Sequence, residues 1–216
     1  MFQNRTEAAE RLFEVIDARD LENEVDLVVA VPRGGLPLGR VVADELEVPL
    51  DIVAAKKLGA PGNSELAIGA VAADGSLWRN EPLIARLGVD EAYIDEERER
   101  VAQLAREKAE RYRVDGPETV AGRRVLIVDD GVATGATMFA CVESLRNADA
   151  ASVVVAVPVG PPNTLEQLRQ VADDVVVVEA PPHFAAVGQF YERFEQVSDE
   201  EAIAMLHGER PGAPGV

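Results

Sequence analysis

The sequence has little cysteine, little lysine and no long apolar run, and each shortage excludes a class of protein. Its single cysteine, Cys141, rules out both a disulfide framework and a cysteine-rich metal site. No apolar run approaches the roughly 18 residues that a membrane-spanning helix requires. The first residues also lack the apolar core of a signal peptide. We therefore expect a cytoplasmic protein with no membrane partner.

Positive charge is scarce as well. Asp and Glu number 39 against 21 Lys and Arg, which gives a net charge of −18, and only Lys56, Lys57 and Lys108 are lysines. Such a surface repels anionic polymers, so we expect no direct nucleic-acid partner. It suits a halophilic cytoplasm, because the Debye length falls to about 3 Å at 1 M salt. An acidic surface for a protein partner would have the same composition.

What the chain does contain is an alternation of strands and helices. Its 216 residues, 47% of them hydrophobic, are enough for one domain with a sizeable core. Continuous apolar stretches, typical of buried strands, lie at 26–31, 50–55, 125–128, 152–157 and 175–178. Segments with helical spacing lie at 7–19, 36–46, 136–147 and 164–171. This alternation predicts an α/β fold with a central, mostly parallel sheet and helices on both faces.

The segment from about 56 to 122 interrupts the alternation. Residues 58–63 are rich in turn formers, 66–72 with 76–78 are predicted to form a hairpin, and 90–113 are predicted to form a long charged helix. We therefore predict a single domain over 1–209 that carries an inserted hood or lid at about 56–122. A flexible tail is expected at 210–216.

The strongest functional signal is the run from Val125 to Thr137. Four apolar residues end at Asp129 and Asp130, and the small-residue loop Ala133–Thr137 then opens a helix. Ligands of parallel sheets bind beyond the carboxyl ends of the strands. Backbone N–H groups and hydroxyls at a helix N-terminus suit a phosphate monoester, while carboxylates can accept sugar hydroxyls or help to place a divalent cation. The run matches neither the nucleotide P-loop nor the dinucleotide fingerprint.

This run resembles the 5-phosphoribosyl-1-pyrophosphate (PRPP) motif of type I phosphoribosyltransferases. The turn at 31–35, Val-Pro-Arg-Gly-Gly, follows the first strand and resembles the pyrophosphate loop of that family. The resemblance extends over about 5–205. It is closest to a poorly characterised branch of predicted phosphoribosyltransferases, with 57–63 and 187–191 as branch-specific stretches.

The resemblance implies a type I phosphoribosyltransferase fold that binds PRPP with Mg²⁺. The residues implied for the 5-phosphate are Ala133, Thr134, Gly135, Ala136 and Thr137. Those implied for the pyrophosphate are Arg33, Gly34, Gly35 and Lys57. Asp129 and Asp130 would hold the ribose hydroxyls, act in catalysis and assist a Mg²⁺ held mainly by PRPP. The acceptor would lie near His183 and Phe184.

The implied activity is transfer of phosphoribosyl to or from a nitrogenous base or similar acceptor, by a homodimer. Members that act on 6-oxopurines carry aspartate where this chain has Ala133, which weighs against a 6-oxopurine acceptor. Two alternatives remain open. One is a non-catalytic sensor of PRPP or a nucleotide on the same fold, because a fold alone does not establish a function. The other is a transferase that uses a different phosphorylated sugar.

Overall fold

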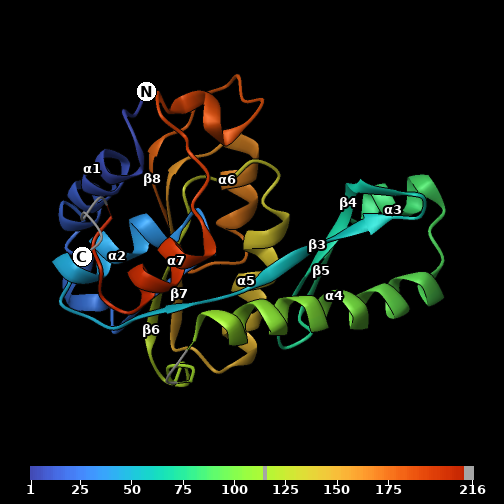
Figure 1. Ribbon diagram of the computed structural model, residues 1–216. Helices are drawn as coiled ribbons and strands as arrows, with labels where there is room; N and C mark the ends of the chain where they lie inside the picture. The colour runs from blue at the N-terminus through green and yellow to red at the C-terminus, as the bar shows by residue number, and fades with distance from the viewer. Residues whose placement is uncertain (114–115, 212–216) are drawn as a thin grey trace.

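The computed structural model describes residues 1–113 and 116–211, and its strands form two sheets (Figure 1). The larger sheet has the order β2-β1-β6-β7-β8, and every neighbouring pair in it is parallel. Its strands are β1 (Leu27–Ala30), β2 (Leu50–Ile52), β6 (Arg124–Val128), β7 (Ser152–Val159) and β8 (Asp174–Glu179). The predicted central parallel sheet is thereby confirmed.

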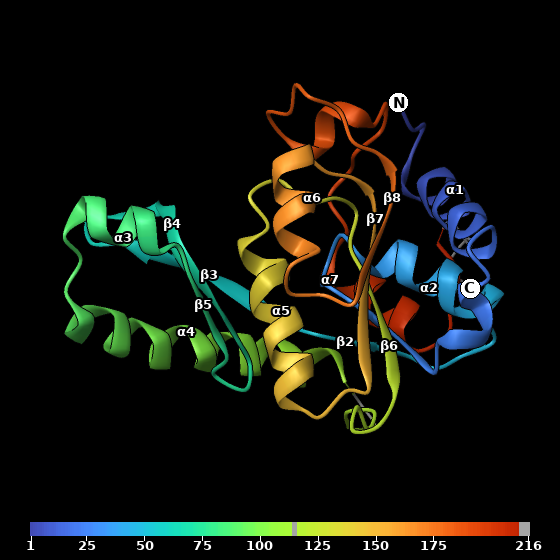
Figure 2. The ribbon, with the colours of Figure 1, turned by 180° about the vertical axis from the view of Figure 1, so that it is seen from behind.

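Helices cover both faces of this sheet (Figure 2). The helices α1 (Arg5–Asp17) and α2 (Leu36–Glu45) lie on one face, and α5 (Ala136–Asn147) and α6 (Pro162–Leu168) lie on the other. Successive side chains of a strand point to opposite faces. Val28 accordingly joins the apolar cluster with α1 and α2, whereas Val29 joins the cluster with α5 and α6. Burial on both faces explains why these strands are continuously apolar.

The C-terminal part of the chain follows β8 and lies beside the N-terminal residues and α2. It contains the 3-10 helix η2 (Val187–Phe190) and the helix α7 (Asp199–Leu206), whereas the other 3-10 helix, η1 (Leu21–Glu24), precedes β1. A capping box begins α7, where Ser198 and Glu201 each accept the other's backbone N–H. Within the described ranges, no helix combines the length and apolarity needed to cross a membrane.

The insertion forms an arm, defined here as residues 55–113, that projects from the core (Figure 1). Its antiparallel sheet has the order β3-β4-β5, from β3 (Ala55–Ala60), β4 (Asn63–Ala72) and β5 (Leu77–Arg79). Two helices complete it, α3 (Glu81–Leu87) and α4 (Glu91–Tyr112). The arm has an apolar cluster of its own. Trp78 stacks on Phe139 of α5 with 4.9 Å between ring centroids, which ties the arm to the core.

Two predictions for the insertion are confirmed, and a third is confirmed over a shorter segment. The hairpin at 66–72 and 76–78 is β4–β5, and the long helix is α4. The turn expected within 58–63 is confirmed but shorter, since β3 continues to Ala60 and β4 begins at Asn63, which leaves Pro61 and Gly62 as the turn. Gly59 serves close strand approach there, because a Cβ on it would lie 2.6 Å from Ser64 Cα. Of the predicted tail, Arg210 pairs with Asp44 at 2.8 Å, and 212–216 lie outside the described residues.

Candidate active site

The two glycine-containing loops singled out in the sequence lie side by side. They follow β1 and β6, which are neighbours at the centre of the parallel sheet and end at the same edge. The backbone N–H of Val31 donates to the carbonyl of Val128 at 2.9 Å. Neighbouring parallel strands therefore bring residues about a hundred positions apart in sequence to one site, at the edge where α/β folds bind ligands.

The loop at 133–137 forms an open cradle at the N-terminus of α5. Gly135 is the N-cap in the left-handed region, with φ of 76°, and it has no side chain to occupy the first N–H groups of the helix. Thr164 Oγ1 donates to the carbonyl of Ala133 at 2.8 Å and holds the loop in place. All five residues predicted for the 5-phosphate line one cavity of about 180 Å³. Backbone N–H groups in this arrangement suit an anion.

Asp130 is held in place from several sides. Its side chain forms an ion pair with Arg5, in which Nε and NH2 lie 2.9 and 2.8 Å from Oδ2. The Arg5 guanidinium lies over the ring of Phe194, 3.9 Å from its centroid. The hydroxyl of Tyr191 donates to the Asp130 carbonyl at 2.6 Å. Asp130 is 9% exposed, so these contacts fix a nearly buried carboxylate.

Asp129 has fewer partners than its neighbour. It is half-buried, and one carboxylate oxygen accepts the backbone N–H of Asp130 at 2.9 Å. Burial raises the pKa of Asp129, and the negative charge of Asp130 raises it further. Burial also raises the pKa of Asp130, but the Arg5 guanidinium opposes that rise. Asp129 is therefore the carboxylate that would gain most from a cation brought by a ligand.

The loop at 31–35 packs so closely on Asp130 that it requires glycine. A Cβ on Gly34 would lie 2.2 Å from Asp130 Oδ2, and one on Gly35 would lie 2.5 Å from the carbonyl oxygen of Val128. Any side chain at these positions would push the two loops apart. Arg33, beside them, extends toward α7, where its NH1 lies 3.2 Å from Asp199 Oδ1.

All three lysines of the sequence lie at this site. Lys57, on β3, lines the cavity formed by the loop at 133–137, together with Asp129. Lys56 lines a different cavity, of about 340 Å³, together with Arg33 and Lys108. Lys108 reaches it from α4 and donates to the carbonyl of Pro32 at 2.8 Å. The arm thus adds its lysines to loops that belong to the core.

A third cavity, of about 420 Å³, adjoins Asp130 on the side of the C-terminal segment. Its lining residues are Arg5, Arg33, Gly34, Asp130, Val187, Phe194, Glu195, Gln196 and Val197. His183 and Phe184 do not line it. The ring of Phe184 packs on Phe190 with 4.9 Å between centroids, and His183 is exposed. The structure therefore does not bring these two residues together with the other predicted site residues.

Sequence reasoning missed three residues of the site, namely Arg5, Tyr112 and Asp199. Arg5 lies 125 positions from Asp130, and Asp199 lies 166 positions from Arg33. No motif or spacing connects residues so far apart. One compositional sign points to this region, namely the scarcity of lysine elsewhere in the chain.

The carboxylates suit a cation that is shared with a ligand. Across the described part of the chain, no three residues among His, Cys, Asp and Glu are grouped closely enough to hold a metal ion. Asp129 nevertheless retains a carboxylate oxygen beyond the one that accepts the Asp130 N–H. Oxygen ligands of this kind, completed by substrate phosphates, are the usual donors to Mg²⁺.

Comparison with known proteins identifies the family of this chain. Residues 2–195 match the family described as phosphoribosyl transferase domain. Two curated Mycobacterium tuberculosis proteins, provisionally described as phosphoribosyl transferases, are 39% identical over 209 residues, which cover 95% of this chain and 46% of each relative. The chain thus spans about half the length of these relatives. A crystal structure from Thermus thermophilus has a TM-score of 0.80 and 40% identity, covering 95% of this chain and 97% of that one. On these matches the chain belongs to the phosphoribosyl transferase family.

Proposed function

We propose that this protein binds PRPP with Mg²⁺ and transfers phosphoribosyl to or from a nitrogenous base or similar acceptor. The observation that carries the proposal is the meeting of three features at one sheet edge. These are the open helix N-terminus at 133–137, the carboxylates Asp129 and Asp130, and the loop at 33–35 with its surrounding cations. Together they match the 5-phosphate, ribose and pyrophosphate of PRPP in kind and in order.

Each feature has a role in the proposed reaction. The bond between the anomeric carbon and the pyrophosphate oxygen breaks, pyrophosphate leaves, and a nitrogen of the acceptor bonds to that carbon. Positive charge develops on the sugar, and Asp129 and Asp130 stabilise it. Arg33, Gly34, Gly35 and Lys57 hold the leaving diphosphate, and the geometry adds Lys56 and Lys108 to that set. Mg²⁺, when bound, would neutralise charge on the leaving diphosphate, with Asp129 as its protein ligand.

For the acceptor we propose the cavity beside Asp130 in place of the region around His183 and Phe184, since these two residues do not line it. It adjoins both the carboxylate and the loop at 33–35, so a base there would face the anomeric carbon. The ring of Phe194 and the side chain of Val187 offer apolar contact, and Gln196 offers an amide that can both donate and accept. A flat heterocycle with polar edges fits this lining.

The proposed function predicts release of pyrophosphate when the correct acceptor is supplied. Candidate bases are incubated with PRPP and Mg²⁺ in molar KCl, and pyrophosphate is followed enzymatically. The Asp129→Asn variant is the control, since contaminating activity would persist in it. If PRPP binds tightly but no base causes release of pyrophosphate, the protein is a PRPP sensor and not a transferase. If PRPP does not bind but another phosphorylated sugar is turned over, that sugar is the donor instead of PRPP.

The arm is expected to close over bound PRPP, because oxocarbenium chemistry beside water invites hydrolysis. Lys108 already contacts the loop that carries Arg33. Hydrogen exchange should therefore show increased protection of the arm, above all in Glu91–Tyr112, when PRPP and Mg²⁺ are added. The amides of residues 12–17, in the second half of α1 and away from Arg5, serve as the internal reference. Equal protection of α4 in both states would make it a static part of the fold.

A further inference from the structure

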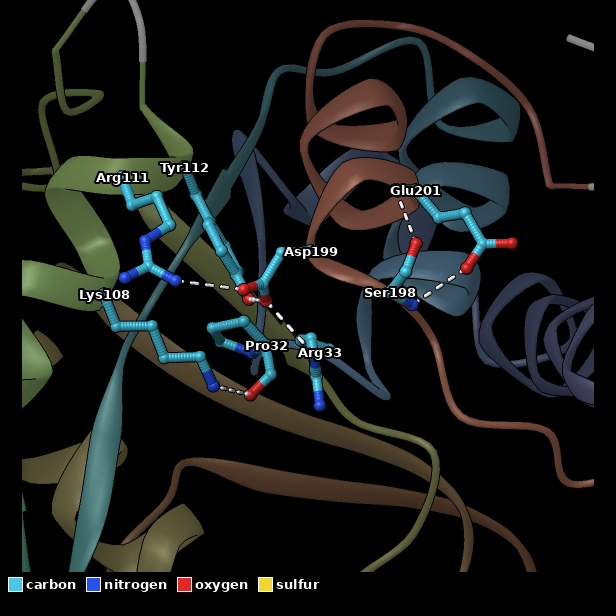
Figure 3. A network of polar contacts seen from close by, with 8 residues as sticks. All are labelled: Pro32, Arg33, Lys108, Arg111, Tyr112, Ser198, Asp199 and Glu201. Atoms are coloured by element: carbon cyan, nitrogen blue, oxygen red, sulfur yellow. Dashed lines mark hydrogen bonds and ion pairs between the residues drawn. The ribbon is translucent and has the colours of Figure 1, made fainter.

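Asp199, a carboxylate that the sequence did not predict for the site, connects three parts of it. Asp199 is the first residue of α7, and its side chain lies between the loop of Arg33 and the end of α4 (Figure 3). Its Oδ1 lies 3.2 Å from Arg33 NH1, and its Oδ2 lies 3.1 Å from Arg111 NH1. The hydroxyl of Tyr112 also donates to Oδ1. A single side chain thus binds the core loop, the arm and the C-terminal helix to one another.

The position of Asp199 is set by its backbone. The capping box between Ser198 and Glu201 begins α7 with hydrogen bonds of 3.1 and 2.8 Å. The Tyr112 hydroxyl lowers the pKa of Asp199, and Arg111 and Arg33 lower it further, so the group is ionised at neutral pH. Asp199 therefore presents a fixed negative charge to the two arginines.

The surrounding cavity has an excess of positive charge that Asp199 does not neutralise. Four cations line it, namely Arg33, Lys56, Lys108 and Arg111, and only Glu107 and Asp199 among its lining residues are anions. Burial lowers the pKa of Lys108, and Lys56 and Arg33 lower it further. The ammonium of Lys108 donates to the neutral carbonyl of Pro32. In a protein with a net charge of −18, this cavity is built for an anion with more charge than one carboxylate.

We propose that Asp199 is an internal counter-ion of this cavity, which holds Arg33 and Arg111 in the ligand-free protein and releases them to an incoming diphosphate. The proposal rests on the proposed function, since it takes the cavity to be the diphosphate site. Asp199 then acts through the two arginines, as a positioning residue. Its negative charge keeps them ordered before binding, and it also competes with the ligand for them. The affinity of the site for diphosphate is accordingly lower than the four cations alone would give.

The test measures binding of inorganic pyrophosphate and of PRPP by calorimetry, with and without Mg²⁺. Asp199→Asn keeps the size of the side chain and an acceptor for Tyr112, and it removes the charge. We expect it to bind pyrophosphate about two- to fivefold more tightly than the wild-type protein, because the charge it removes opposes the ligand. Glu200→Gln, one residue further along α7 and exposed, is the matched control and should leave the affinity unchanged. Circular dichroism and thermal melting establish that each variant is folded.

A double-mutant cycle separates release of the arginines from a general change of charge. In the Arg33→Gln and Arg111→Gln background, Asp199→Asn should no longer tighten binding. If the gain persists there, or if Asp199→Asn binds pyrophosphate no better than the wild-type protein, the counter-ion proposal is overturned while PRPP binding stands. If the wild-type protein binds neither probe but Asp199→Asn binds pyrophosphate, the counter-ion proposal holds and the proposed function falls. If neither protein binds either probe, both fall.

Discussion

Asp129→Asn should lower the turnover of PRPP by about 10²–10³-fold while changing PRPP affinity far less. The reason is that, in the proposed reaction, Asp129 stabilises positive charge that develops on the sugar only near the transition state. The substitution keeps the acceptor for the Asp130 N–H, so the loop should retain its shape. Steady-state kinetics give turnover, and calorimetry gives affinity. Asp17→Asn, an exposed carboxylate at the end of α1, is the control.

The same variant should be more stable than the wild-type protein. Since burial raises the pKa of Asp129 in the folded state, the native protein binds its proton more tightly than the unfolded chain does. The free energy of unfolding of the wild-type protein therefore falls as the pH rises from the ordinary pKa of aspartate through the raised pKa of Asp129. Asparagine has no titrating proton, so its stability does not fall in this way. The difference in free energy of unfolding between Asp129→Asn and the wild-type protein should therefore increase over that pH range. Thermal melts of both proteins measure it. Equal turnover in the two proteins would remove Asp129 from the catalytic set.

Thr134→Val combined with Thr137→Val should weaken PRPP binding by about 10²–10⁴-fold. Each hydroxyl is expected to donate to the 5-phosphate, and each lost charge-assisted hydrogen bond costs about 1.5–3 kcal/mol. Thr134 is exposed and Thr137 half-buried, so neither substitution should unfold the protein. Thr119→Val, on an exposed segment before β6, provides the control. Unchanged PRPP affinity in the double variant would exclude the loop at 133–137 as the phosphate site.

The parallel sheet could be predicted because burial on both faces forces its strands to be apolar without interruption. Val125–Val128 and the neighbouring runs carry that signal directly. The loops that follow them could be placed together because adjacent parallel strands end at one edge. Strand β3 is harder to predict from the sequence, since Lys56, Lys57 and Gly59 are residue types that are common in solvated turns. Its pairing with β4 decides its structure, including the irregular register near Gly59.

The contacts of Arg5 and Asp199 could not be predicted for a different reason. Each depends on a chain segment far away in sequence that folds back onto the sheet edge. Arg5 reaches Asp130 because residues near the N-terminus pair with the C-terminal segment, as in the hydrogen bond from the Phe2 N–H to the Phe190 carbonyl at 2.7 Å. Such closure is a property of the packed chain, and a single sequence contains no local pattern for it.

The stack of Trp78 on Phe139 gives the protein an optical probe of its own. Trp78 is the only tryptophan, so the indole fluorescence of the chain comes from this one joint. The ring belongs to β5 of the arm, and its partner belongs to α5, which begins at the loop at 133–137. Emission from unlabelled protein therefore reports directly on how the arm is seated against that helix, with no dye to attach and no residue to replace.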